Sequence, residues 1–312
     1  MAIEPVTPPS FDGVESADAL AAGLESVGYL PGETTALVSF LAMRLGKPIL
    51  VEGPAGVGKT ELAKALSRFT GRELIRLQCY EGVDEAKALY EWNYKKQLLR
   101  IQAGSAQSEG SGTESGGTWD SVQDNIFSEE FLLERPLLRA IASPEPVVLL
   151  IDEIDKTDHE FEALLLEILS DFQVSIPELG VVEATTHPIV LLTSNDSREL
   201  TEALKRRCLY LWLDYPDNAR EVEIVRLHVP EIDQQVAERL VEVIDMVRQL
   251  DVKKPPSISE SIDWARTLML LGADQIDQKV FNDTMSIIVK HRTDLDLVAE
   301  RVGVKLGNGN LG

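Results

Sequence analysis

Short apolar runs alternate with helix-like segments through the first two thirds of the chain. The compact apolar runs, typical of buried strands, are residues 48–51, 74–79, 147–151, 189–193 and 209–213. Segments with apolar residues at helical spacing are 34–45, 60–69, 84–100 and the stretch after Thr157, where Glu160 completes a predicted capping box. The run at 147–151 is wholly aliphatic, as in a central strand covered on both faces. Alternating strands and helices predict an α/β fold with a parallel sheet flanked by helices.

The pattern changes after residue 215, where only helix-like segments remain. We therefore predict an α/β nucleotide-binding domain at 34–215, a small all-helical lid at 216–305 and a tail at 306–312. Residues 1–33 form an N-terminal leader. Two features interrupt the main domain: residues 104–118, whose Gly- and Ser-rich composition predicts a flexible insert, and a hairpin at about 172–184.

Composition narrows the function classes. The 312 residues have a formal net charge of −22, which disfavours sequence-independent nucleic-acid binding because that affinity depends on Lys and Arg. No apolar stretch approaches the roughly 20 residues that span a bilayer, and the N-terminus lacks a signal peptide, so we expect a cytoplasmic protein without membrane insertion. The only cysteines, Cys79 and Cys208, are expected to be buried free thiols. Magnesium is the only metal expected.

A glycine-rich loop between a predicted strand and a predicted helix carries the clearest chemistry. Its sequence matches the phosphate-binding pattern GxxxxGK(S/T). Backbone N–H groups of such a loop wrap phosphates, Lys59 would neutralise the β/γ-phosphates, and the Thr60 hydroxyl would bind Mg²⁺. The predicted ATP-binding residues are Gly53, Pro54, Ala55, Gly56, Val57, Gly58, Lys59, Thr60 and Glu61.

Polar residues at the ends of two later strands predict hydrolysis rather than nucleotide binding alone. Asp152 and Glu153 follow the aliphatic strand, at the carboxyl edge where ligands bind in open α/β sheets. Asp152 is suited to hold Mg²⁺ and Glu153 to activate the attacking water. Asn195 follows the next strand and is a candidate sensor that orients the same water. Asp155 and Asp158 are interpreted as structural caps.

Arg206 and Arg207 precede the last strand and lie far along the chain from the phosphate loop. An arginine supplied by a neighbouring molecule would stabilise charge on the transferred phosphoryl group. The alternative is a solvated basic turn. Of the two residues we favour Arg207 as the arginine finger.

Taken in order, these motifs resemble an AAA+ module over roughly residues 30–300. The hairpin before the sensor strand is similar to an insertion in the clade that contains the MoxR family. Within that family, several motifs look most like the CoxD group. These motifs are Tyr90-Glu91-Trp92, Arg135-Pro136-Leu137-Leu138, Asp152-Glu153-Ile154-Asp155-Lys156 and Arg206-Arg207-Cys208-Leu209-Tyr210.

The resemblance implies a homo-oligomeric ring, a hexamer with ATP and Mg²⁺ at its subunit interfaces, that acts as a chaperone-like motor. It also implies a partner with a von Willebrand A domain and a client enzyme whose metal centre is matured. One departure concerns the lid, where family members carry a second sensor arginine. Here the comparable stretch is Ser257-Ile258-Ser259-Glu260-Ser261, and Arg266 is the nearest substitute.

Two other classes of function stay open at this point. A monomeric P-loop switch or small-molecule kinase would need neither the paired arginines nor the lid, and a GTPase should carry an NKxD motif that the chain lacks. A nucleic-acid motor of the AAA+ class shares all the ATP-binding residues, although the negative charge disfavours it.

Overall fold

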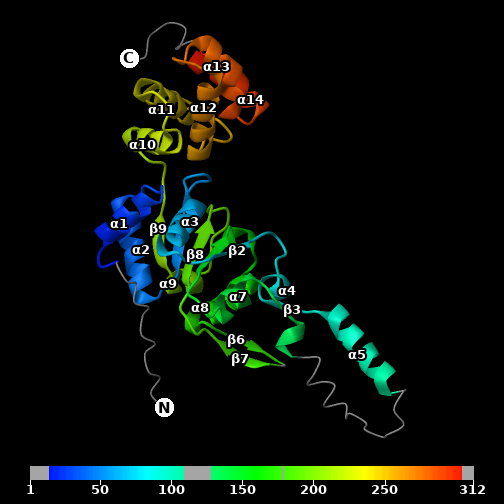
Figure 1. Cartoon of the computed structure of the whole chain (residues 1–312). Helices are drawn as coiled ribbons and strands as arrows, with labels where there is room; N and C mark the ends of the chain where they lie inside the picture. Colours follow the sequence, from blue (N-terminus) through cyan, green and yellow to red (C-terminus); the bar gives the residue numbers. More distant parts are fainter. Residues whose placement is uncertain (1–13, 109–127, 178, 304–312) are drawn as a thin grey trace. The chain divides into compact units, whose positions relative to one another are not determined.

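The structure is a computed structural model that describes residues 14–108, 128–177 and 179–303 (Figure 1). These residues form two compact units. The described residues of 14–27, 31–52 and 60–211 form the first unit, and residues 28–30, 53–59 and 212–303 form the second.

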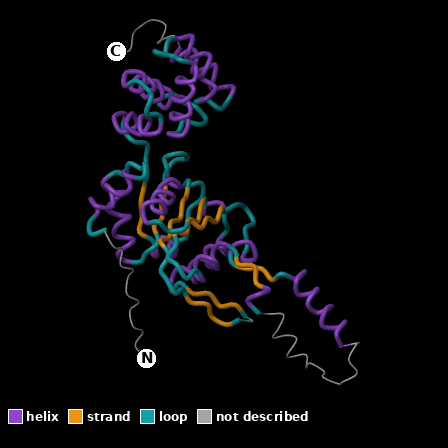
Figure 2. Tube along the Cα trace, viewed as in Figure 1, coloured by secondary structure: helices purple, strands orange, loops and turns teal. Residues whose placement is uncertain are grey.

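A five-stranded sheet forms the centre of the first unit. Its strands lie in the order β2-β5-β8-β1-β9, with the β2–β5, β5–β8 and β8–β1 pairs parallel (Figure 2). The bounds are β1 Ile49–Glu52, β2 Leu74–Gln78, β5 Val148–Asp152, β8 Ile189–Ser194 and β9 Leu209–Trp212. Every residue of β1, β5 and β8 is buried, as the continuous apolar runs predicted. The predicted α/β fold with a parallel sheet is therefore confirmed.

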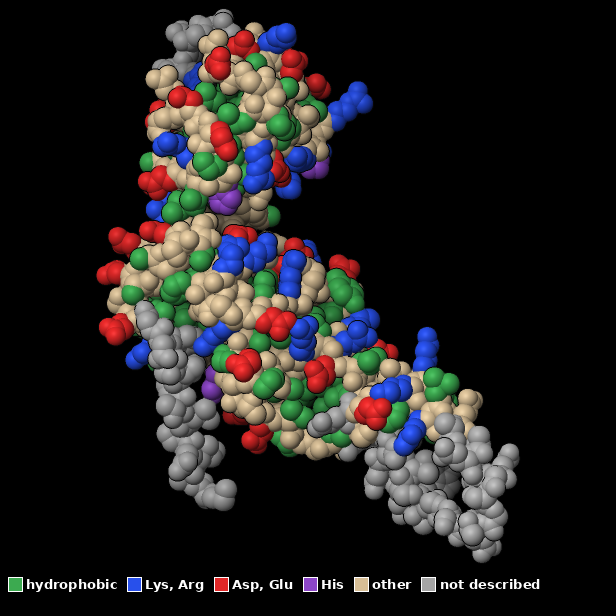
Figure 3. All heavy atoms as spheres, in the orientation of Figure 1, with side chains coloured by type: hydrophobic (Ala, Val, Ile, Leu, Met, Phe, Trp, Pro, Cys, Tyr) green, Lys and Arg blue, Asp and Glu red, His purple; other side chains and the backbone are tan. Residues whose placement is uncertain are grey.

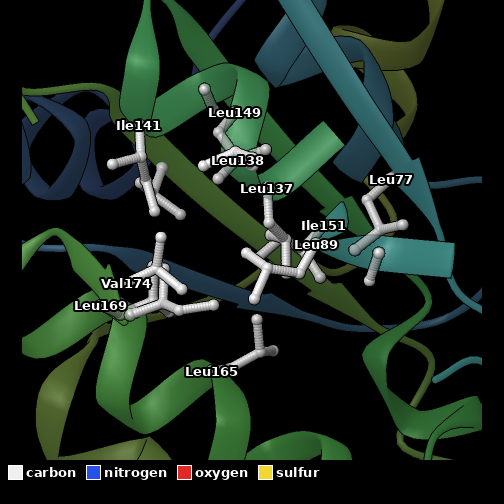
Figure 4. Packing of buried hydrophobic residues seen from close by; sticks show 14 of the residues in the cluster. Leu77, Leu89, Leu137, Leu138, Ile141, Leu149, Ile151, Leu165, Leu169 and Val174 are labelled. Carbon is white, nitrogen blue, oxygen red and sulfur yellow. The ribbon is translucent and has the colours of Figure 1, made fainter. Parts of the chain in front are cut away.

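Helices that precede and follow these strands along the chain complete this unit. They are α1 Ala17–Ser26, α2 Glu33–Leu45, α3 Lys59–Thr70, α7 Pro136–Ala142, α8 His159–Asp171 and α9 Glu202–Arg207. Figure 4 shows apolar side chains of α7, α8 and the sheet pointing toward one another, including Leu137, Leu165 and Ile151. All three are fully buried. This close packing fixes the sheet that carries the candidate site.

Residues 84–100 are not one helix, contrary to the prediction. The chain instead forms α4 Glu85–Ala88, β3 Tyr90–Trp92 and α5 Tyr94–Ser108. Strand β3 pairs antiparallel with β4, Leu132–Glu134, which lies far along the chain. This non-local pairing overrides a local helical pattern. Helix α5 also takes in residues 104–108 of the predicted flexible insert, and residues 109–118 of that insert lie outside the described residues.

The start of α8 also differs from the prediction. Asp158 caps the helix by accepting a hydrogen bond from the Phe161 N–H at 2.9 Å, so the predicted capping box of Thr157 and Glu160 is wrong. The Thr157 hydroxyl instead donates to the Ile154 carbonyl within the 3₁₀ turn η2, Ile154–Lys156. The predicted hairpin is present as β6 Gln173–Ile176 and β7 Gly180–Glu183, which pair antiparallel.

The second unit is helical after β9. Its helices are α10 Asn218–His228, α11 Gln234–Arg248, α12 Ile258–Leu271, α13 Gln278–Thr284 and α14 Arg292–Val298. The apolar stripe of α11 packs with Trp264 of α12 and Phe281 of α13, both fully buried. A buried ion pair between Glu221 and Arg248, 2.5 Å apart, lies in the same unit. Within the part of the chain that is described, no helix is long and apolar enough to cross a bilayer.

Candidate nucleotide site

The glycine loop joins β1 to α3 and has the backbone shape that a phosphate cradle needs. Gly53, Gly56 and Gly58 have φ values of 148°, 78° and 97°, in the region that favours glycine. A Cβ at Gly53 would lie 1.9 Å from the Leu213 carbonyl oxygen. Because α3 begins at Lys59, its first N–H groups are available to an anion.

Lys59 lies on the inside of this loop, only 6% exposed. Its Nζ donates to the carbonyl oxygens of Gly53, at 2.6 Å, and Pro54, at 2.7 Å. Phosphate oxygens are stronger acceptors for this ammonium group than the two carbonyl oxygens that it contacts in the loop. Glu61, the last residue of the predicted set, instead pairs on the α3 surface with Lys64 and with Arg68 at 2.8 Å.

Asp152, at the sheet's carboxyl edge, accepts hydrogen bonds from several side chains. It is 3% exposed, and its Oδ1 accepts from the Thr60 hydroxyl at 3.0 Å and the Thr193 hydroxyl at 2.6 Å. Its Oδ2 accepts from Arg76 of β2, with Nε at 3.1 Å and Nη2 at 2.5 Å. The structure thus brings Thr60 and Asp152 together, although they are distant in sequence.

The Thr60 and Asp152 pair fits Mg²⁺. This ion prefers oxygen ligands and takes one or two protein oxygens alongside water and substrate phosphates. Among the described residues, no three His, Cys, Asp or Glu side chains gather as a self-sufficient metal cluster. One carboxylate and one hydroxyl therefore suit a metal that arrives with the nucleotide.

Glu153 follows β5 in a left-handed conformation, with φ 59° and ψ 50°. Such a conformation costs a non-glycine residue free energy, and it persists where neighbours hold it in place. The Thr193 hydroxyl does so by accepting the Glu153 N–H at 2.9 Å while donating to Asp152. Glu153 itself is half-buried.

Asn195 directly follows β8 and is half-buried. The next residues are anchored by Asp155, whose Oδ2 accepts from the Ser197 N–H at 3.1 Å and hydroxyl at 2.5 Å. Burial raises the pKa of Asp155, but the Ser197 hydrogen bonds outweigh it, so this pKa lies below the ordinary value. Asp155 therefore stays ionised and holds the segment after β8 to the turn η2 that follows β5.

The two cysteines are free and buried, as predicted. Burial, with the nearby Asp152, Asp155 and Glu153 carboxylates, raises the pKa of Cys79 to about 12. Burial also raises the pKa of Cys208 to about 12. A protonated, enclosed thiol is a poor nucleophile, so neither cysteine contributes chemistry to this site.

Arg206 and Arg207 lie in the last turn of α9, and both are exposed. Neither makes an ion pair or a side-chain hydrogen bond with the residues that the structure describes. In the second unit, Arg266 is 55% exposed and pairs with Asp263 on its own helix at 3.5 Å. Arg266 therefore sits as a surface residue of α12.

Sequence reasoning missed two residues that contact Asp152. The first of these is Thr193, which lies near the end of β8, just before the predicted sensor Asn195. Its hydroxyl would be a recognisable signal only if the sequence showed that β8 lies beside β5. Arg76 occupies a strand position that alternates with the buried Ile75 and Leu77, a pattern that also fits a solvated face. Only the pairing of β2 with β5 places it next to Asp152.

Comparison with known proteins agrees with this geometry. Residues 48–208, just over half of the chain, match the family described as AAA domain (dynein-related subfamily). A gas vesicle ATPase GvpN from Haloferax mediterranei is 26% identical over 222 residues, covering 67% of this chain and 58% of the relative. GvpN1 from Halobacterium salinarum is 22% identical, covering 84% of this chain and 71% of the relative.

Among solved structures, a Thermotoga maritima RuvB P216G mutant aligns with a TM-score of 0.49 and 17% identity, covering 90% of this chain and 73% of that one. The chain spans little more than half the length of the Haloferax relative. The family match includes the phosphate loop, Asp152, Glu153, Asn195 and both arginines. The chain belongs to the AAA domain family, in its dynein-related subfamily, and carries the ATPase module of that family.

Proposed function

We propose that this chain hydrolyses ATP as part of a ring of identical subunits and uses the energy to remodel a client protein. One observation carries the proposal. The Asp152 carboxylate is buried and hydrogen-bonded within its own chain, whereas Arg206 and Arg207 are exposed and unpaired among the described residues. Arginines without an internal partner suit a site on a neighbouring subunit.

Each residue then has a role that its position supports. The loop N–H groups and Lys59 bind the phosphates, and Thr60 and Asp152 hold Mg²⁺. When bound, this ion neutralises charge on the phosphoryl oxygens. Glu153 accepts a proton from the attacking water, and Asn195 orients that water. Arg207 of the next subunit stabilises the charge that develops during transfer.

The finer parts of the proposal come from resemblance. The names of the two haloarchaeal relatives support ATP hydrolysis here. A hexameric MoxR-type chaperone, a CoxD-like role in metal-centre maturation and a von Willebrand A partner extend this proposal from the resemblance carried by the motifs at residues 90–92, 135–138, 152–156 and 206–210. A cytoplasmic location extends it from the two free cysteines, which suit a reducing compartment. Both acidic and basic side chains lie on the face seen in Figure 3, and the net charge of −22 favours a protein client over a nucleic acid.

The test is steady-state ATPase activity against protein concentration for the wild type, Arg207→Ala, Glu153→Gln and an equal mixture of the two variants. In a ring, a site needs an intact acceptor subunit with Glu153 and an intact donor with Arg207. Each variant alone should be inactive. The mixture should regain activity at about one quarter of its interfaces, as random heterologous assembly predicts.

The competing functions give other results. Activity that does not depend on concentration, and that survives in Arg207→Ala, would contradict the ring and favour a monomeric P-loop switch or small-molecule kinase. Tight, steeply salt-dependent DNA binding would favour a nucleic-acid motor instead. The mass of the wild type in solution with ATP separates the monomer from the ring directly.

A further inference from the structure

Glu162 is a buried carboxylate that none of the proposed steps uses. It lies on α8 and is 0% exposed. Its Oε2 accepts from the Thr201 N–H at 2.8 Å and the Thr201 hydroxyl at 2.6 Å, and its Oε1 lies 2.6 Å from Nη2 of Arg198. Burying a charge is costly unless it is paired, so these contacts hold Glu162 in one position and hold its partners in turn.

The partners of Glu162 lie at the start of the helix that carries the arginines. Thr201 is the N-cap of α9, and its hydroxyl accepts from the Leu204 N–H at 3.4 Å. Helix α9 has only six residues, too few to be stable alone in water. Its direction therefore depends on the anchored cap at Thr201 and on the buried Leu204. Arg206 and Arg207 follow one turn later.

The same connecting segment is anchored near the hydrolysis site. Asp155, two residues after Glu153, holds Ser197, and Glu162 holds Arg198 and Thr201. Burial raises the pKa of Glu162, but hydrogen bonds from Thr201 and the charge of Arg198 outweigh it, so this pKa lies below the ordinary value. The ionised side chain links α8 to α9, and these two helices pack together.

We propose that Glu162 is a positioning residue for the arginine that one subunit supplies to the next. It fixes the first turn of α9 so that Arg207 is held at the angle a neighbouring phosphoryl group requires. The inference rests on the proposed ring function, and it assigns Glu162 to the donor side of the composite site. A purely structural or same-subunit role would instead impair the acceptor side or the whole fold.

Mixed rings separate these roles. Glu162→Gln alone should lose roughly 10²-fold in turnover, the size of effect that a misplacement of about 1 Å produces. Mixed with Glu153→Gln, which is defective only as acceptor, it should regain activity at about one quarter of interfaces. Mixed with Arg207→Ala, also a defective donor, it should regain none. The KM for ATP should stay unchanged because the acceptor site is intact.

The opposite pattern overturns the inference. Rescue by Arg207→Ala but not by Glu153→Gln would place Glu162 on the acceptor side, and failure to rescue with either would mean a general structural loss. Glu160→Gln is the matched control, since it removes the same charge from an exposed position in the same turn of α8. It should match the wild type in every mixture.

A second variant tests the same link without changing Glu162 itself. Thr201→Val removes the hydroxyl that donates to Glu162 while leaving the carboxylate in place, and it should fall into the donor class with a smaller loss, on the order of tenfold. Equal wild-type activity in Thr201→Val would contradict the proposed link. The Arg207→Ala and Glu153→Gln pair is measured first. If that pair fails to rescue, the ring proposal fails; if it rescues and Glu162→Gln behaves as an acceptor variant, only this inference fails.

Discussion

The carboxyl edge of the sheet and the end of α9 differ in how their charged residues are held. Asp152 is 3% exposed and accepts hydrogen bonds from three side chains of its own subunit. Arg207 is exposed and makes no ion pair within the described part of the chain, although Asp and Glu number 52 against 30 Lys and Arg. Under the proposed ring function, this difference is what we expect: residues used within one subunit are positioned by internal contacts, and an arginine used by a neighbouring subunit is left exposed.

Removing residues of these two kinds should affect catalysis and stability differently. Removing an internally bonded residue should reduce both, because its buried partners lose their hydrogen bonds. Removing an exposed arginine should reduce catalysis alone, because a surface side chain without partners contributes little to folding. Four variants test this division.

Arg207→Ala should have the largest effect on turnover, a loss of roughly 10³-fold, because an arginine finger stabilises charge in the transition state. Its melting temperature should match that of the wild type. ATPase assays and thermal unfolding of the same preparation measure both quantities. Arg206→Ala is the matched control and should retain more activity; a larger loss in Arg206→Ala would assign the finger to Arg206.

Glu153→Gln should lower turnover by roughly 10²-fold or more, since a positioned general base contributes about that much. Because the amide keeps the size and backbone of Glu153, binding of ATP should persist. Single-turnover kinetics and equilibrium binding of a fluorescent ATP analogue measure the two properties. Full activity in this variant would remove Glu153 from the mechanism.

Some of these residues could be predicted from the sequence and others could not. The phosphate loop, Asp152 and Glu153 were predictable because their residues are contiguous and follow a strongly apolar strand. The Thr193 and Arg76 contacts were not, since they depend on β5 lying between β2 and β8. Strand β3 was missed for the same reason, as its partner β4 lies about forty residues away. Strand order arises from long-range packing, which local periodicity does not encode.

Thr193→Val sharpens the comparison at the buried edge. The valine keeps the volume but removes the hydroxyl that donates to Asp152 and accepts the Glu153 N–H. Leaving such buried groups unsatisfied should cost about 1–3 kcal/mol of unfolding free energy. Chemical denaturation measures the loss, and turnover should fall with it. Unchanged stability would show that water replaces the hydroxyl and that the edge is less enclosed than its burial indicates.

Arg76→Gln should have the smallest effect. The arginine is 48% exposed, so solvent screening limits its ion pair with Asp152 to about 1 kcal/mol or less. Because its guanidinium neutralises the carboxylate that Mg²⁺ would bind, its removal should lower the Mg²⁺ concentration for half-maximal ATP binding by at most about fivefold. Without nucleotide, the free energy of unfolding should fall by a similarly small amount.

Titration of Mg²⁺ against a fluorescent ATP analogue measures that shift. Arg139→Gln is the control, since it removes an arginine paired with Glu73, which is exposed and lies at the opposite end of β2 from Gln78. If Arg76→Gln instead raises the Mg²⁺ requirement, the arginine holds Asp152 in its metal-binding position. Arg76 would then belong with Thr193 among the residues that prepare the buried edge, because a competing cation and a supporting one shift this requirement in opposite directions.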